Sequence, residues 1–159
     1  MNATPEERLA AAGLKLPPVA PPVAVYVPAV VSGHYVYTSG QLPMVDGALP
    51  RTGKVGGEVT PEQGAELARQ CALNALAAVA SVAGDLSAVK RVVKVVGFVA
   101  STADFTGQPG VVNGASELLG TAFGDAGIHA RSAVGVAALP LDAPVEVELT
   151  VELHTPMGV

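Results

Sequence analysis

The sequence predicts one soluble α/β (α+β) domain in which two helices cover one face of a β-sheet. Three segments of its 159 residues carry this prediction. Residues 60–84 have apolar residues at helical spacing after a capped start, residues 89–101 are rich in valine, and residues 145–153 alternate between apolar and polar side chains. Two helices with one apolar stripe each must bury it against a common sheet. The opposite sheet face then needs a cover, which a second copy of the chain would supply.

The chain begins with a predicted helix and an extended arm. Residues 4–7, Thr-Pro-Glu-Glu, are typical of a capping box with proline in the first turn, and they predict a helix over residues 4–14. Residues 17–22 are mostly proline and are therefore extended, because each proline fixes its own φ angle and restricts the residue before it. We expect residues 1–22 to form this helix and arm, and residues 23–159 to form the single domain.

The first half of the domain is predicted from strand and turn signals. Residues 24–31 and 35–39 are rich in β-branched and aromatic side chains, and they flank the turn pair Ser32-Gly33. Residues 41–59 contain several glycines and predict a long loop or a further hairpin.

Both helices of the domain are predicted from their starts and stops. Thr60 begins a second capping box, and Gly84 ends the apolar stripe that follows it. Another helix is expected over residues 109–125, with Asp104 or Thr106 as its cap. The glycines at 110, 114 and 120 weaken it by about 1 kcal/mol each relative to alanine, so packing must compensate.

The end of the chain is predicted to be a β-hairpin that carries the candidate functional centre. Residues 131–137 and 145–153 form its two strands, with Arg131 and Glu146 near their beginnings. An arginine at the mouth of an apolar strand is suited to hold a carboxylate through its planar fork. Glu146 would either pair with Arg131 as a plain ion pair or orient a water as a general base.

Composition argues against several classes of partner. The net charge is −5 and the nine basic residues are scattered, which is unlike a nucleic-acid-binding surface. The N-terminus lacks the pattern of a signal peptide, and no apolar run approaches the roughly 20 residues that span a membrane. A single cysteine excludes an internal disulfide. We therefore expect a cytoplasmic protein that binds neither nucleic acid nor membrane.

The sequence contains no familiar metal or cofactor motif. His34, His129 and His154 have no ligand spacing with one another or with Cys71, which lies on the apolar helix stripe. No Gly-x-Ser-x-Gly segment is present, and the residues around Lys54 do not match a P-loop. We predict neither a metal nor a cofactor, and we expect Cys71 to belong to the core.

Four segments together resemble the Rid/YjgF family, the reactive-intermediate imine deaminases. The resemblance covers roughly residues 26–153, and the order of its parts agrees with the family. The segments are Tyr-Thr-Ser-Gly-Gln-Leu-Pro at 37–43, Asn113, Ala-Arg-Ser-Ala-Val at 130–134, and Leu-Pro-Leu-Asp-Ala-Pro-Val-Glu-Val-Glu at 139–148. The resemblance implies a chorismate-mutase-like sheet with two helices on one face. It also implies a trimeric barrel with a cleft for each subunit, and hydrolysis of 2-imino or enamine acids to 2-keto acids and ammonia.

The same resemblance implies roles for individual residues. Arg131 would bind the substrate carboxylate, and Glu146 would hold the attacking water. Tyr26 would cover the substrate. The remaining implied cleft residues are Ser39, Gly40, Asn113 and Ala133.

The chain departs from the family pattern at two positions of the arginine strand and at two longer segments. Ala133 stands where the imine deaminases commonly have cysteine, so a thiol role is excluded, and Gly135 stands where glutamate is often found. The N-terminal helix and arm and the loop over 44–57 are additions, which indicates a divergent branch of the family. Two alternatives to a deaminase remain open. One is a non-catalytic trimer that binds small carboxylates and regulates or protects a partner, and the other is an endoribonuclease.

Overall fold

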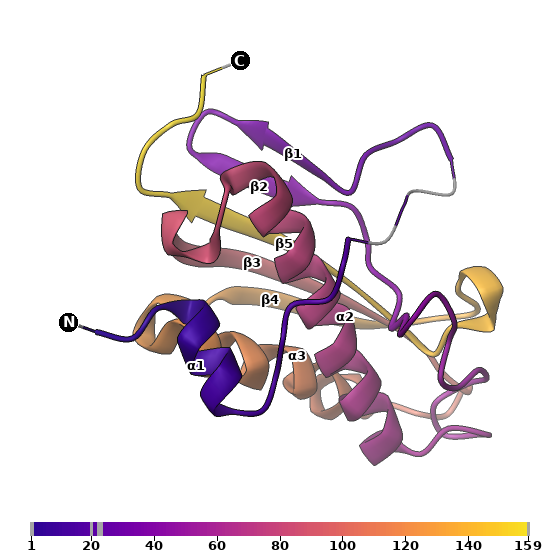
Figure 1. Ribbon diagram of the computed structural model, residues 1–159. Helices are drawn as coiled ribbons and strands as arrows, with labels where there is room; N and C mark the ends of the chain where they lie inside the picture. Colours follow the sequence, from indigo (N-terminus) through magenta and orange to yellow (C-terminus); the bar gives the residue numbers. More distant parts are fainter. Residues whose placement is uncertain (1, 20, 22–23, 159) are drawn as a thin grey trace.

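The computed structural model describes residues 2–19, 21 and 24–158 (Figure 1). Its helices and strands follow one another in the order α1 (Pro5–Ala11), β1 (Ala29–Ser32), β2 (Tyr35–Thr38), α2 (Pro61–Ala83), β3 (Val89–Ala100), α3 (Gln108–Phe123), β4 (Ala130–Val136) and β5 (Val145–Leu153). Short 3-10 turns lie at Leu86–Ala88, Gly124–Gly127 and Pro140–Asp142. No helix of the described residues is long and apolar enough to cross a membrane.

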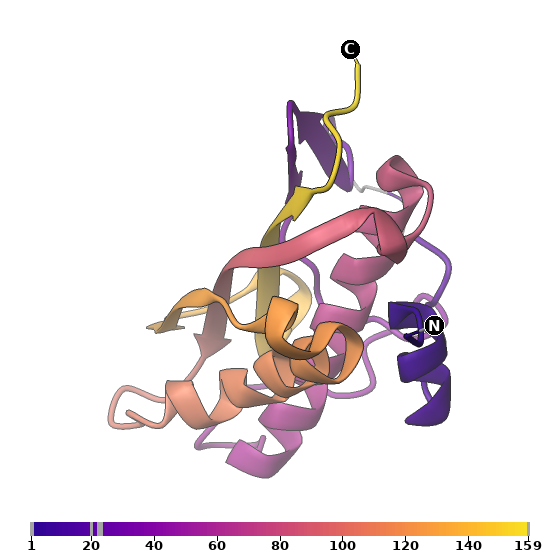
Figure 2. The same cartoon turned by 90° about the vertical axis from the view of Figure 1, so that its left-hand side faces the viewer.

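The strands form one five-stranded sheet in the order β1-β2-β5-β3-β4. β4 runs parallel to β3, and all other neighbours are antiparallel. α2 and α3 lie on the same side of this sheet, and α1 packs outside them (Figure 2). The predicted fold class, a sheet with two helices on one face, is confirmed.

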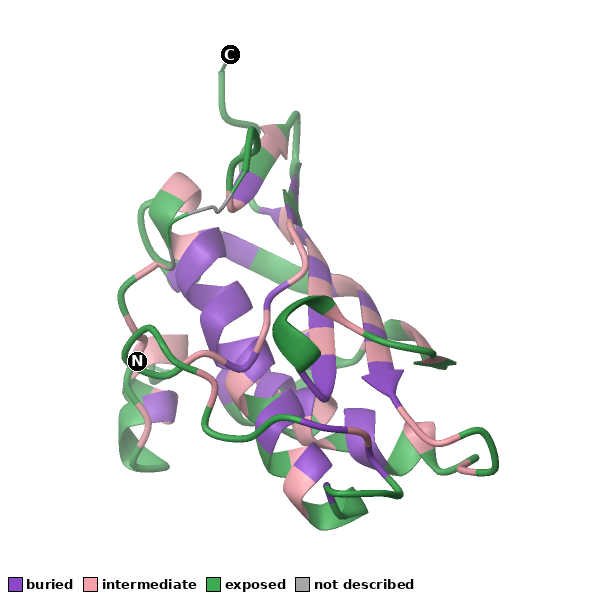
Figure 3. Ribbon diagram, turned by 90° about the vertical axis from the view of Figure 1, so that its right-hand side faces the viewer, coloured by how far each residue is buried: buried purple, intermediate pink, exposed green. Residues whose placement is uncertain are grey.

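Small side chains allow the helices to approach the sheet and each other closely. Buried residues gather along α2 and on alternate positions of the strands (Figure 3). Cys71 is fully buried, as predicted, and its thiol donates to the carbonyl of Val145 at 3.6 Å. Burial, and secondarily the charge of Glu146, raises the pKa of that thiol. Where α3 crosses α2, a side chain at Gly114 would collide with the backbone carbonyl of Ala65, so glycine is required by the close contact.

The predicted C-terminal hairpin is wrong, because β3 lies between β4 and β5. A strand–helix–strand connection through α3 brings β4 back parallel to β3. β5 then pairs with the other edge of β3, with Glu146 opposite Phe98. The local alternation in residues 145–153 correctly predicted a strand but could not show which neighbour it pairs with.

Several predicted boundaries also need correction. β1 begins only at Ala29, and residues 24–28 form no strand. α1 ends at Ala11, two residues before a glycine with positive φ. The N-cap of α3 is Gly107, which makes no side-chain cap bond, in place of Asp104 or Thr106. The loop over 41–59 contains only isolated β-bridges. Residues 20 and 22 of the predicted arm, and residue 23 before the predicted first strand, lie outside the described residues.

The sheet face away from α2 and α3 carries exposed apolar side chains. Val30, Tyr35 and Tyr37 are exposed on β1 and β2, and the two tyrosine rings lie 6.4 Å apart between centroids. They border a polar row on β5, whose outward side chains are Glu146, Glu148, Thr150 and Glu152. Contiguous exposed aromatic area of this kind is typical of a surface that another protein covers.

Candidate active site

Arg131 is held against one face of helix α3. It lies opposite Val95, a buried residue of β3, so its side chain points to the helix side of the sheet. The guanidinium donates from Nη1 to Asn113 Oδ1 at 2.8 Å and to Ser116 Oγ at 3.2 Å, and from Nη2 to the carbonyl oxygen of Pro109 at 3.2 Å. Asn113, which the family resemblance had placed in the site, is therefore brought to Arg131.

The spacing of these acceptors determines which donors of Arg131 remain available. Positions 109, 113 and 116 follow one another along one face of a helix. The two Nη1 hydrogens and one Nη2 hydrogen are directed along that row. Of the five N–H donors of an arginine, Nε–H and one Nη2–H have no partner among the described residues. Two neighbouring donors of this kind match the two oxygens of a carboxylate.

Glu146 lies on the opposite face of the same sheet. Its neighbours Val145 and Val147 are fully buried under the helices, so the side chain between them points outward. Arg131 points to the helix side, and β3 separates the two strands. Of the two alternatives left open for Glu146, an ion pair with Arg131 within one chain is therefore wrong, because the two side chains face opposite sides of the sheet.

A cavity of about 290 Å³ lies beside Glu146. Its lining residues are Pro21, Tyr26, Pro28, Gly40, Gln41, Leu42, Met44, Pro140, Leu141 and Glu146. Burial, followed by the negative charge of Glu148, raises the pKa of the Glu146 carboxyl. A single carboxyl group in a mostly apolar cavity, with a raised pKa, is the pattern of a general base or acid.

The structure brings Gly40 and Tyr26 to this cavity, while Ser39 is not among its lining residues. A side chain at residue 40 would occupy the position of the Glu146 carboxylate, so Gly40 gives that carboxylate its space. Tyr26 lines the cavity and is half exposed. Ser39 donates its hydroxyl to the carbonyl of Val27 at 2.6 Å and fixes the segment that carries Tyr26.

Asn74 is a site-shaping residue that sequence reasoning missed. Its buried Nδ2 donates to the carbonyls of Leu42 at 2.9 Å and Met44 at 3.0 Å, which lie in the cavity wall. Gln70 in turn donates to Asn74 Oδ1 at 3.0 Å. A lone amide within the apolar stripe of α2 was the available signal, because a buried polar group requires partners.

The turn at the cavity rim carried part of the family resemblance, but none of its residues was predicted to belong to the site. Leu141 and Asp142 are consecutive residues with positive φ, at 58° and 59°, and Leu141 is exposed. Such backbone conformations in residues other than glycine concentrate at functional sites. The Leu-Pro turn of the sequence thus presents an apolar side chain over Glu146.

Ala133 and Gly135 follow Arg131 along the helix side of β4. Ala133 is half buried and packs against the core. A side chain at Gly135 would come within 2.7 Å of Gln108 Nε2 and 2.9 Å of Ser101 Oγ, which fill the space there. Within the described part of the chain, no three His, Cys, Asp or Glu side chains gather as a metal site.

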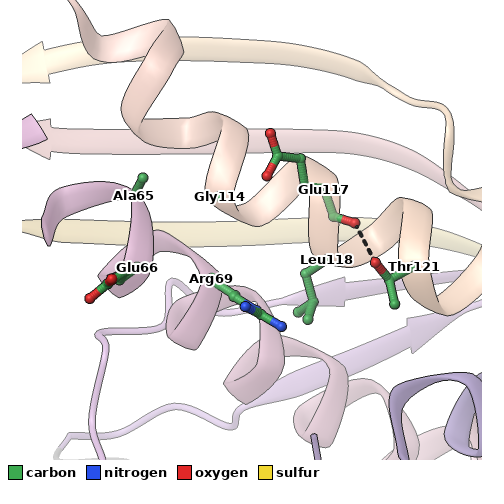
Figure 4. A pocket seen from close by; sticks show the side chains of 7 residues that line it. All are labelled: Ala65, Glu66, Arg69, Gly114, Glu117, Leu118 and Thr121. Carbon is green, nitrogen blue, oxygen red and sulfur yellow. Dashed lines mark hydrogen bonds between the residues drawn. The ribbon is translucent and has the colours of Figure 1, made fainter. Parts of the chain in front are cut away.

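A separate groove of about 270 Å³ lies between α2 and α3 (Figure 4). Glu66 and Glu117 flank it, and Arg69 is directed toward Leu118. Thr121 donates its hydroxyl to the backbone carbonyl of Glu117 at 3.0 Å. The groove shares no residue with the surroundings of Arg131 or Glu146, which makes Arg69 and Glu66 suitable control positions.

The architecture and the two sets of polar residues define a chorismate-mutase-like α+β protein with an arginine on one sheet face and a glutamate on the other. A family model described as "YjgF/chorismate mutase-like, putative endoribonuclease" matches residues 6–153. The chain therefore belongs to the YjgF family, as the resemblance predicted. The match begins within α1, so the family pattern includes most of this helix.

Known relatives agree with this assignment over most of their length. The chain is 48% identical over 143 residues to Protein TCP17 of Trypanosoma cruzi, covering 89% of both chains. It is 46% identical to a crystallised Agrobacterium tumefaciens protein of unknown function, with a TM-score of 0.87 over 94% of this chain and 92% of that one. It is also similar to E. coli TdcF, solved with bound serine, at 25% identity and a TM-score of 0.60 over 86% and 93% of the two chains.

Proposed function

We propose that this protein hydrolyses small reactive 2-imino acids, or their enamine forms, to 2-keto acids and ammonia. The observation that supports the proposal is that the two candidate side chains, Arg131 and Glu146, lie on opposite faces of the sheet. Arg131 offers a free pair of N–H donors on the helix side, and Glu146 offers a half-buried carboxyl group of raised pKa on the other side. A carboxylate-bearing imine needs both functions, one to hold the carboxylate and one to handle a proton.

The two groups would act together in a homotrimer. Because they face opposite sides of the sheet within one chain, only another copy can bring the Glu146 cavity opposite Arg131. The exposed tyrosines at 35 and 37 supply apolar surface for such contact. A closed ring of identical, head-to-tail interfaces would repeat the same pairing at each subunit boundary.

The proposed reaction needs no nucleophilic side chain. Arg131 binds the carboxylate, and Glu146 removes a proton from a water that attacks the imine carbon. The resulting carbinolamine carries one hydroxyl and one amine on that carbon. Glu146 returns the water proton to the nitrogen as this carbinolamine forms, and it then moves the hydroxyl proton to the amine. The C–N bond breaks as the C=O bond of the keto acid forms, and ammonia leaves. Burial raises the pKa of Glu146 above that of an exposed glutamate, which favours its action as both proton acceptor and proton donor.

A small-carboxylate-binding protein without catalysis is the second candidate. It is favoured by the bound serine in E. coli TdcF, since serine carries a carboxylate. Such a protein would need Arg131 but not Glu146. An endoribonuclease, which the family description names, is disfavoured by the net charge of −5.

The deciding experiment measures imine hydrolysis directly. A dehydratase generates 2-iminobutanoate or 2-aminoacrylate while semicarbazide competes for the imine, and keto-acid release is followed with and without this protein. We expect activity in the wild type, none in Arg131→Ala and little in Glu146→Gln. Arg69→Ala and Glu66→Gln are the matched controls, because both residues are exposed in the separate groove.

Each other outcome assigns a different function. If the wild type binds a keto acid through Arg131 but hydrolyses no imine, the protein is a non-catalytic small-carboxylate-binding protein. RNA cleavage, with RNA affinity that falls steeply as salt is added, would establish the endoribonuclease.

A further inference from the structure

Arg131 is the first member of a hydrogen-bond chain that continues behind it. Ser116 Oγ, which accepts from Arg131 Nη1 at 3.2 Å, lies 2.9 Å from His129 Nε2. His129 Nδ1 lies 2.6 Å from the carbonyl oxygen of Gly127. Ser116 and His129 are both half buried. The chain thus joins the strand that carries Arg131, helix α3 and the 3-10 turn before β4.

The chemistry of the last link fixes the direction of the others. A carbonyl oxygen only accepts, so the hydrogen between His129 and Gly127 belongs to Nδ1. In the neutral ring Nε2 is then an acceptor, and the Ser116 hydroxyl must donate to it. The oxygen of Ser116 keeps its lone pairs for Arg131. Each hydrogen of this hydrogen-bond series is therefore assigned to one donor. Arg131 Nη1 donates to Ser116, the Ser116 hydroxyl donates to His129, and His129 Nδ1 donates to the carbonyl of Gly127.

This arrangement draws Ser116 away from its usual local partner. A serine within a helix commonly donates its hydroxyl to the carbonyl one turn earlier. Here His129 takes that hydrogen instead, and a donated hydrogen makes the serine oxygen a stronger acceptor for the guanidinium. His129 directly precedes the Ala-Arg-Ser segment, so the turn that begins β4 also sets the orientation of its arginine.

We propose that Ser116 and His129 are positioning residues that hold the Arg131 guanidinium rigid, with its Nε and Nη2 donors presented to a carboxylate. The inference rests on the proposed function for what Arg131 binds. Neither residue touches the substrate. Their loss should weaken carboxylate binding and raise KM with little change in kcat, because the proton chemistry at Glu146 is untouched.

The first test follows Arg131 itself, without any ligand. In ¹⁵N NMR of the wild-type protein, we expect slow rotation about the Arg131 Cζ–Nη bonds, assigned by comparison with Arg131→Lys. Rotation should become fast in Ser116→Ala and His129→Phe, and remain slow in the control His154→Phe, which alters an exposed histidine. Fast rotation in the wild type, or slow rotation in both variants, would overturn the proposal.

The second test measures the dissociation constant of 2-ketobutyrate by calorimetry. We expect binding to weaken about threefold to tenfold in Ser116→Ala and His129→Phe, the loss of one net hydrogen bond to a partly exposed charged group. Ser116→Thr and His129→Gln keep a hydroxyl and an acceptor, and should recover most of the affinity. If Ser116→Ala and His129→Phe still weaken 2-ketobutyrate binding when Arg131 is replaced by alanine, the two residues do not act through Arg131. Failure of the wild type to bind any keto acid would count against the proposed function, while the NMR result decides the positioning role independently.

Discussion

The carboxylate of Glu146 occupies the space in which a side chain at Gly40 would begin. The loop after β2 pairs with the start of β5 at this point, because the backbone of Gln41 both donates to and accepts from the backbone of Val147. Gly40 is therefore needed for its missing side chain and not for an unusual φ angle, because its φ is not among the positive values of the chain.

Replacing Gly40 by alanine should displace Glu146 and narrow the cavity. We expect Gly40→Ala to lower kcat/KM by at least about tenfold, since a base moved by even 1 Å loses its alignment with the water. Gly110→Ala is the matched control, because a side chain there meets nothing within 4 Å. Equal activity of the two variants would contradict the role given to this contact.

The raised pKa of Glu146 predicts a specific dependence of stability on pH. Burial and the charge of Glu148 raise its pKa in the folded protein above the unfolded value. Between those two values the folded state retains a proton that the unfolded state has lost, so this group's contribution to stability declines as pH rises through that window.

Glu146→Gln cannot ionise and should not show this loss. We therefore expect Glu146→Gln to raise Tm relative to the wild type more at pH 7 than at pH 4, as measured by thermal melting. Glu66→Gln, which makes the same substitution at an exposed residue, is the matched control. A larger gain for Glu146→Gln at pH 4 would show that the pKa is shifted the other way.

The amide of Asn74 should be required for the shape of the cavity wall. Asn74→Ala removes both donors to Leu42 and Met44 and leaves their carbonyls without these partners, which should cost about 1–3 kcal/mol in unfolding free energy. Under the proposed function KM should rise as well, because the wall of the proposed substrate cavity loosens. Gln70→Ala removes only the bond to Asn74 Oδ1 and should have the smaller effect in denaturant titrations.

The crossing of α2 and α3 predicts opposite effects for one substitution at two positions. Gly114→Ala should destabilise the protein by about 1–3 kcal/mol, because the new side chain meets the Ala65 carbonyl. Gly120→Ala, on the same helix, meets nothing and should stabilise it by up to about 1 kcal/mol. Urea unfolding of both variants measures their free energies of unfolding. Similar free energies would mean that α2 and α3 can move apart without loss of stability.

Mixing two inactive variants tests whether the site forms between subunits. Under the proposed assembly, Arg131→Ala and Glu146→Gln co-expressed in equal amounts should form trimers at random. Each mixed trimer then has one site with an intact Arg131 and an intact Glu146, which makes about one quarter of all sites in the population. Recovery of roughly that share of the wild-type activity is expected. No recovery in verified mixed trimers would contradict a site that combines Arg131 of one subunit with Glu146 of another.

Local sequence patterns predicted most elements but not their neighbours. The capping box at Thr60 and the alternation of residues 145–153 define α2 and β5, because both signals depend on short-range hydrogen bonding and burial. The hairpin error at the C-terminus has a different origin. The pairing of β5 with β3 depends on contacts between residues about 50 positions apart, which no local period records.

For the candidate site, the sequence indicated residues but not how they lie relative to one another. The resemblance indicated Arg131, Asn113, Gly40 and Glu146, and the structure joins the first two and the last two as separate pairs. Ser116 and His129 gave no signal, since a serine and a histidine thirteen positions apart acquire their relation only when α3 folds back on β4.

The placement of Arg131 and Glu146 on opposite sheet faces has a kinetic consequence. Under the proposed assembly, an isolated chain holds two half-sites and no whole one, so specific activity should fall on dilution as subunits dissociate. A cell making little of this protein would then obtain disproportionately little catalysis, and rising synthesis would switch it on more steeply than linearly.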